Sequence, residues 1–234
     1  MTATETLARR GSAEVYAYLR AQILDLGIPP DSKVNIDALG RELGVSQTPI
    51  REALHQLEGD NLIVKTPGRG YRTTPLLRFE QLREMFELRL LIEPWGARAA
   101  AVNRLSNPGR ALESGLKNYI ADSAININAR HLLVSHDMQF HDQILSASHN
   151  EFAHQAIRAT HCHLHLFRLY PADWSSEQTI EEHAAIVEAV RDCDPDAAEK
   201  AMHDHLMGAY HRFAGAFAQE HDHGPRPSTA VRLC

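Results

Sequence analysis

The chain has 234 residues, of which 44% are hydrophobic, a size and composition that suit two modest domains with cores of their own. Its formal net charge of −6 is spread unevenly, because residues 11–78 balance acidic and basic side chains whereas residues 79–234 are acidic. Three scattered cysteines exclude a disulfide framework, and the lack of a long uninterrupted apolar stretch excludes a membrane span. We therefore expect a cytoplasmic protein without a membrane partner, whose acidic C-terminal part does not bind DNA.

The first predicted elements are a helix and then a helix-turn-helix. Apolar residues at helical spacing predict a helix over residues 13–26. Leu39 and Leu43 lie four residues apart and share one face of a short helix, which Gly44 can end in the left-handed conformation. Ser46 can cap the next helix, whose apolar positions have the i, i+3, i+4, i+7 spacing of a buried stripe. These apolar positions are Ile50, Ala53, Leu54 and Leu57.

Polar side chains occupy the other face of this second helix. They lie at its beginning and middle, the part of a helix that enters the major groove of DNA. We therefore interpret it as a recognition helix, and the alternative is a structural helical hairpin that does not touch DNA. The residues of this helix predicted to contact DNA are Ser46, Gln47, Thr48, Arg51 and His55.

A β-hairpin is predicted directly after the recognition helix. Residues 62–65 and 71–74 have the composition of strands, and two glycines lie in the turn between them. Gly68 and Arg69 lie at the tip, where they can reach DNA. A helix-turn-helix followed by such a wing predicts a winged helix-turn-helix DNA-binding domain over residues 11–75.

The rest of the chain is predicted to be helical, so the fold class is mainly α. Residues 79–220 show helical periodicity with short breaks, which indicates an all-α antiparallel bundle of six helices. The linker between the domains is short, so we expect them to be mechanically coupled. Residues 221–234 are expected to form a disordered tail. The predicted helices run over 80–105, 109–126, 130–147, 150–169, 175–192 and 195–220.

Four polar residues of this bundle are candidate metal ligands. Asp137 and His141 lie four residues apart on one side of a helix, and His183 and His205 lie among apolar residues of two later helices. One carboxylate and three imidazoles suit a divalent transition metal. Alternatively, these residues bind no metal and form ordinary side-chain pairs on a helix, either exposed to solvent or hydrogen-bonded within the protein. A metal-dependent hydrolase using this His/Asp cluster is a second alternative, although no phosphate loop is evident.

Arg89 is a candidate contact for an acidic ligand. It shares a helical face with Phe86 and Glu93 and therefore points toward the interior of the bundle. A guanidinium group can clamp a carboxylate through two parallel hydrogen bonds. The alternative partner is the side chain of Glu93, four residues further along the same helix.

Residues 43–58, LGVSQTPIREALHQLE, and residues 68–71, GRGY, closely resemble the N-terminal domain of GntR-superfamily transcription regulators. This resemblance implies that residues 46–48 and Arg51 contact the operator and that the wing glycines let the backbone approach the minor groove or the phosphates. The chain has Gln47 where the family usually has arginine. Because glutamine pairs well with adenine and arginine with guanine, we expect a different base preference there.

The C-terminal part resembles the FCD domain, the ligand-binding domain of the FadR-type branch, and its predicted helix number is similar to that of the VanR-like subgroup. The resemblance implies a homodimeric transcription regulator rather than an enzyme, in which one metal lies at the floor of an effector pocket. Zinc is the first choice, with nickel, manganese or iron as alternatives. A small organic or sugar acid effector would relieve repression at a roughly palindromic operator. The matching segments are 86–93, 137–141, 182–187 and 205–206, and the implied ligands are Asp137, His141, His183 and His205.

Overall fold

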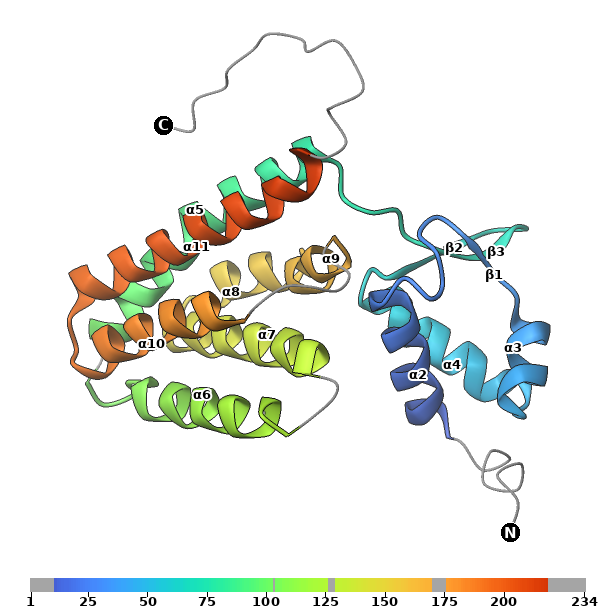
Figure 1. Cartoon of the computed structure of the whole chain (residues 1–234), viewed down its shortest axis with the longest axis horizontal. Coiled ribbons are helices and arrows are strands. Elements are labelled where there is room, and N and C mark those ends of the chain that lie inside the picture. Colours follow the sequence, from blue (N-terminus) through green and yellow to red (C-terminus); the bar gives the residue numbers. More distant parts are fainter. Residues whose placement is uncertain (1–10, 103, 126–128, 170–175, 219–234) are drawn as a thin grey trace, which may run out of the picture.

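The computed structural model describes residues 11–102, 104–125, 129–169 and 176–218. It contains a small N-terminal domain and a larger helical domain, joined by a short linker (Figure 1). The predicted fold class, mainly α with a winged helix-turn-helix followed by a helical bundle, is confirmed. Among the described helices, none is both long and apolar enough to cross a membrane. The expected tail at 221–234 lies outside the described residues.

The N-terminal domain has the element order of a winged helix-turn-helix. α3 begins after Asn35, whose side-chain oxygen accepts a hydrogen bond from the Ala38 amide at 3.0 Å. It ends at Gly44, where a φ of 66° is the left-handed conformation that glycine adopts without strain. Ser46 occupies the N-cap position of α4, but its side chain makes no capping hydrogen bond to that helix. The elements are α2 (Ser12–Leu24), β1 (Lys33–Val34), α3 (Ile36–Leu43), α4 (Gln47–Gly59), β2 (Ile63–Thr66) and β3 (Gly70–Thr73).

The predicted apolar stripe of α4 forms the centre of this domain. Its four residues, Ile50, Ala53, Leu54 and Leu57, are completely buried. They pack against the buried face of α2, which consists of Val15, Leu19, Ile23 and Leu24. Burial of the stripe leaves the polar face of α4 in solvent, as its period requires.

The wing belongs to an antiparallel sheet of three strands in the order β1-β3-β2. β3 pairs with β2 through the register Lys65 opposite Tyr71, and with β1 through Lys33 opposite Arg72. The sequence pattern predicts only the β2–β3 hairpin. It gives no signal for β1, because two residues are too few to show an alternating pattern.

The larger domain contains more helices than predicted. The expected helix over 150–169 is interrupted by residues 159–161, and His161 has a φ of 48°. No glycine or proline marks this break, so periodicity alone extended the helix across it. The described part of this domain therefore has seven helices: α5 (Phe79–Val102), α6 (Gly109–Ser123), α7 (Ala129–Ala147), α8 (Glu151–Arg158), α9 (Cys162–Arg168), α10 (Glu177–Arg191) and α11 (Pro195–Ala218).

The two longest helices, α5 and α11, lie side by side along one edge of the bundle (Figure 1). Their contact includes an edge-to-face pair between the rings of Phe86 and Tyr210, whose centroids are 5.6 Å apart. Leu82, Met202 and Leu206 are completely buried in the same core. This packing fixes α5 and α11 relative to α10, which also contacts both of them.

The two domains share an apolar cluster. Leu133 and Val134 of α7 and Leu164 and Phe167 of α9 belong to the same buried cluster as the core of the N-terminal domain. In Figure 1 the end of the bundle that carries α9 faces α2. A polar contact at this seam joins Arg130 of α7 to the Asp25 carboxylate at 3.0 Å. The α7–α9 side of the bundle is therefore the part that can influence the N-terminal domain.

Candidate metal centre and DNA-reading surface

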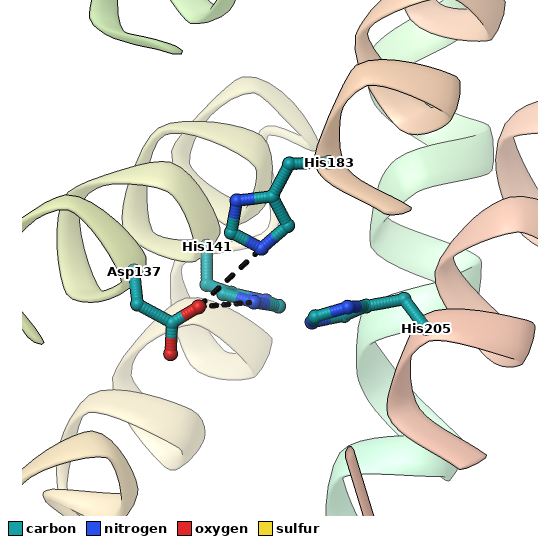
Figure 2. A group of neighbouring side chains, drawn as sticks. All are labelled: Asp137, His141, His183 and His205. Carbon is teal, nitrogen blue, oxygen red and sulfur yellow. Dashed lines mark ion pairs between the residues drawn. The ribbon is translucent and has the colours of Figure 1, made fainter. Parts of the chain in front are cut away.

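The structure brings together all four predicted metal ligands. Asp137 and His141 come from successive turns of α7, His183 from α10 and His205 from α11. One ligand atom of each residue lies within 4.8 Å of the ligand atoms of the others. Figure 2 shows the four side chains pointing toward a common centre. The three imidazoles are buried, so the cluster lies inside the bundle rather than on its surface.

The donor atoms that face this centre are suited to a cation. Asp137 Oδ1 lies 3.7 Å from His141 Nε2 and 3.3 Å from His183 Nε2. Both Nε2 atoms are buried and have no hydrogen-bond partner among the described residues. A buried nitrogen without a partner is destabilising unless something binds it. The residues therefore fit a divalent metal, for which neutral imidazole nitrogens and one carboxylate oxygen are ordinary ligands.

A carboxylate outside the cluster holds each of two imidazoles. His141 Nδ1 lies 2.5 Å from Glu93 Oε2, and His205 Nδ1 lies 2.8 Å from Glu182 Oε2. When each Nδ1–H donates to its carboxylate, the lone pair of Nε2 is directed at the centre. An arginine completes each pair, because Arg89 donates to Glu93 and Arg212 donates to Glu182.

The third imidazole is held by another histidine. His183 Nδ1 lies 3.2 Å from His136 Nε2, and the His183 ring stacks on Phe140 with the ring centroids 3.9 Å apart. His136 therefore contacts His183 rather than the centre.

Burial sets the protonation state of the imidazoles. Desolvation lowers the pKa of His141 to about 4 and that of His183 to about 3. Both are therefore neutral near pH 7, which is the form that binds a metal. Burial would raise the pKa of Asp137, but the hydrogen-bonded His163 outweighs it and holds that pKa well below its usual value. Asp137 therefore presents a negative charge to the centre, and His141 and His183 present neutral nitrogens.

Arg89 lies beside the cluster and is paired with Glu93. Arg89 Nε donates to Glu93 Oε1 at 2.6 Å, and Nη2 donates to Oε2 at 3.2 Å. Both side chains are at most 2% exposed. The sequence leaves two possible partners for Arg89, an acidic ligand and Glu93, and this ion pair is with the second. It places Arg89 behind His141. The role of Arg89 as an effector contact stays a prediction.

A cavity of about 320 Å³ adjoins the cluster between α7, α8 and α9. Its wall includes apolar side chains, several imidazoles and one cation, Arg158, together with the carboxylates of Asp60 and Asp142. The apolar side chains and Arg158 can accept an acid that has an apolar part. Asp60, at the C-cap of α4, also lines it. Wall residues contributed by the bundle include His141, Leu145, Ile157, Arg158, Cys162 and His163.

The predicted DNA-contacting residues are all exposed. Ser46, Gln47, Thr48, Arg51 and His55 of α4 and its cap are exposed, as are Gly68 and Arg69 of the wing. Gln47 donates to Asp37 Oδ1 of α3 at 2.6 Å and accepts from Arg51 at 3.0 Å. The sequence analysis did not select Lys33, which lines a hollow beside the wing together with Arg69 and Arg72.

Sequence reasoning also missed the side chains that hold the ligands. The pattern places Glu93 only as a possible partner of Arg89, and it gives no role at the cluster to Glu182 or Arg212. The pattern also gives no role at the cluster to His163, yet its Nδ1 lies 2.7 Å from Asp137 Oδ2. The only sequence signal for these residues is that a charged or polar side chain stands at a helix position expected to be apolar. Such a signal does not identify the partner of the side chain.

Comparison with known proteins gives two family matches. Residues 12–72 match the model for bacterial regulatory proteins of the gntR family, and residues 84–208 match the FCD domain model. The galactonate operon transcriptional repressor of Escherichia coli strain K12 is 30% identical over 205 residues, covering 78% of this chain and 88% of that protein. The HTH-type transcriptional repressor RspR of the same strain is 27% identical over 198 residues, covering 83% and 85%.

Solved structures with the same fold are also found. A GntR-type protein from Rhodococcus sp. RHA1 aligns with a TM-score of 0.66 at 20% identity, covering 88% of this chain and 98% of that chain. McbR/YncC of E. coli aligns with a TM-score of 0.63 at 16% identity, covering 94% and 100%. At these identities the likeness concerns the fold alone.

Proposed function

Because the chain belongs to the GntR family of bacterial regulatory proteins and carries an FCD domain, it is a DNA-binding transcription regulator and not an enzyme, and we propose that it is a repressor controlled by a small carboxylate effector. The effector binds at a metal held by Asp137, His141, His183 and His205. The observation that carries this proposal is the convergence of these four side chains inside the bundle (Figure 2).

Zinc is the first candidate for the metal, and nickel, manganese and iron are alternatives. Three imidazole nitrogens and one carboxylate oxygen are donors that all four metals accept. The bound metal supplies an electrophilic centre that attracts an organic or sugar acid. The cavity of about 320 Å³ next to His141 gives such an acid room. Arg89 does not line this cavity, but it lies behind His141 and is the candidate to add positive charge to the site.

At the other end of the molecule, the exposed face of α4 and the wing read the operator. A homodimer presents two such faces, so the operator is roughly palindromic and its half-site spacing follows the separation of the two recognition helices. Effector binding changes that separation and weakens operator binding. The names of two relatives, both transcriptional repressors, support repression as the mode of control.

The metal site is tested by elemental analysis of purified variants. We expect about one metal per chain in the wild type and little in His183→Ala and His205→Ala, because each change removes one ligand. His203→Ala is the matched control, since His203 lies on the same helix as His205 but is 54% exposed. Equal metal content in all four proteins would overturn the proposed metal site.

A further inference from the structure

We propose that α9 connects the metal cluster to the DNA-reading domain. In this proposal His163 is a positioning residue for the metal ligand Asp137, and Arg168 binds the interdomain linker. This inference rests on the proposed function, because it specifies how the state of that metal site reaches the recognition helix. α9 is only seven residues long, so the two contacts lie little more than one helical turn apart.

At the metal end, His163 holds one oxygen of the Asp137 carboxylate. His163 Nδ1 lies 2.7 Å from Asp137 Oδ2, whereas the other oxygen, Oδ1, faces His141 and His183. His163 is only 8% exposed, so solvent competes little for this contact. Any rotation of the carboxylate that accompanies metal binding at Oδ1 therefore displaces the partner of His163.

At the other end, Arg168 holds the start of the linker. Its Nη1 donates to Thr74 Oγ1 at 2.8 Å, and its Nη2 donates to the Thr74 carbonyl at 2.5 Å. Arg168 is 1% exposed, and its described hydrogen-bond partners are all neutral oxygens of Thr74 and Pro75. A cation buried against neutral groups is costly, so this contact persists only while the surrounding packing holds it.

From Thr74 the hydrogen bonds continue to the recognition helix. Thr74 Oγ1 donates to the Asn61 carbonyl at 3.0 Å, and the Thr74 amide donates to the Leu62 carbonyl at 3.0 Å. Asn61 directly follows Asp60, the C-cap of α4. α9 also contacts this segment itself, because His165 Nε2 lies 3.4 Å from Asn61 Nδ2.

α9 is placed to transmit a displacement as one body. Residues 159–161, with His161 at a φ of 48°, separate it from α8, so it can shift without carrying that helix. Leu164 and Phe167, between the two contacts, are buried in the cluster shared with the N-terminal domain. A shift of His163 therefore also moves Arg168 and the side chains packed on α2.

The test compares operator binding by metal-free and zinc-loaded full-length protein. The operator is isolated by selection from random DNA with the wild type. We expect zinc to change operator affinity of the wild type by roughly fivefold or more, the usual lower range of coupling between two sites. Arg168→Gln should bind zinc with unchanged affinity, while the ratio of its two operator affinities falls toward one. In His163→Leu at saturating zinc, the ratio of zinc-loaded to metal-free operator affinity should likewise fall toward one.

Amide hydrogen exchange provides a second readout that needs no operator. We expect zinc to alter exchange of residues 60–78 in the wild type and much less in Arg168→Gln. Thr74→Val is a second variant of nearly equal volume, which removes the hydroxyl that joins Arg168 to Asn61. It keeps the test decisive if Arg168→Gln fails to fold.

The control removes a seam contact outside α9. His131 of α7 lies 2.9 Å from the Asp25 carboxylate, so His131→Gln weakens the seam but leaves α9 intact, and it should keep the wild-type zinc response. A wild-type response in Arg168→Gln and Thr74→Val, or an equal loss in His131→Gln, would overturn this inference alone. A wild type that binds no zinc would overturn the metal site and this inference together.

Discussion

At the residue scale, the cluster depends on side chains that do not face its centre. The carboxylate of Glu93 fixes the ring of His141, and that of Glu182 fixes the ring of His205, so each ring has one nitrogen left for the centre. The arginine behind each carboxylate keeps it ionised, and the pKa of Glu182 is lowered to about 2 because His205 and Arg212 outweigh its burial. These outer partners therefore orient the rings of His141 and His205 toward the centre.

Glu182→Gln tests this outer contact. The amide is a poorer acceptor for His205 Nδ1–H and no longer matches the charge of Arg212, so we expect zinc affinity to fall by roughly 10–100-fold. Competition with a chelating dye measures this affinity. Glu181→Gln is the control, since it makes the same change in charge at an exposed neighbour. Equal affinities in the two variants would contradict the assigned role.

His165 makes a prediction about acid stability. Burial, and to a lesser degree the neighbouring Arg168, lower its pKa from 6.5 to about 4. Between these values the unfolded chain binds a proton that the folded chain does not, so the stabilising contribution of neutral His165 is lost as the pH falls through this window.

Urea unfolding of wild type and His165→Gln checks that contribution. Glutamine cannot take up the proton, so the stability advantage of the wild type should be smaller near about pH 5 than near about pH 7.5. A pH-independent difference between the two proteins would show that His165 keeps its ordinary pKa in the folded state.

At the scale of elements, α3 and α4 together orient one side chain predicted to contact DNA, that of Gln47. The Gln47 amide donates to Asp37 of α3 and accepts from Arg51 of α4, so its orientation is fixed at the exposed start of the recognition helix. A side chain held in this way loses less conformational entropy when it contacts a base. We therefore expect the departure from the family's usual arginine to affect specificity rather than the fold.

Gln47→Arg should change the base preference from adenine to guanine at one position of each half-site, because arginine pairs best with the acceptors of guanine. Selection from random DNA followed by sequencing compares the variant with the wild type. Gln56→Arg is the control, since it makes the same change at an exposed position of α4 that is not among the predicted DNA contacts, and it should keep adenine at that position. Unchanged preference in Gln47→Arg would exclude Gln47 from base contact.

At the scale of the whole molecule, the cavity beside His141 touches both domains. Its walls come mainly from α7, α8 and α9, and Asp60 at the end of α4 contributes as well. The domains also share one apolar cluster across α2, α7 and α9. A ligand in the cavity is therefore close to the contacts that fix how the recognition helix sits on the bundle.

A thermal-shift screen of organic and sugar acids should identify the effector. At about 100 times its Kd a ligand adds roughly 2.7 kcal/mol of stability, which raises the melting temperature of a chain of this length by about 5–10 °C. The same acid should weaken operator binding by the metal-loaded protein. The control is protein treated with EDTA, in which no shift is expected; a full shift there would show that the acid does not need the metal.

Some features of this protein follow from local sequence. The helix-turn-helix is specified by the i, i+4 spacing of Leu39 and Leu43, by Gly44 and by the apolar stripe of α4. Each of these signals acts over a few positions, because it depends on the helix period or on a residue that ends a helix. The same spacing places Asp137 and His141 on one side of α7. The sequence thus determined the class of both domains and which residue types were available as ligands.

Other features exist only in the folded chain. Asp137 and His205 are far apart in sequence, and their approach depends on how α7, α10 and α11 pack, which no local period encodes. The break before α9, the outer carboxylates and the contact of Arg168 with Thr74 likewise result from packing between distant segments. Tertiary structure decided these features. The period of a helix determines which face a side chain occupies, whereas the element that packs on that face determines the partner of the side chain.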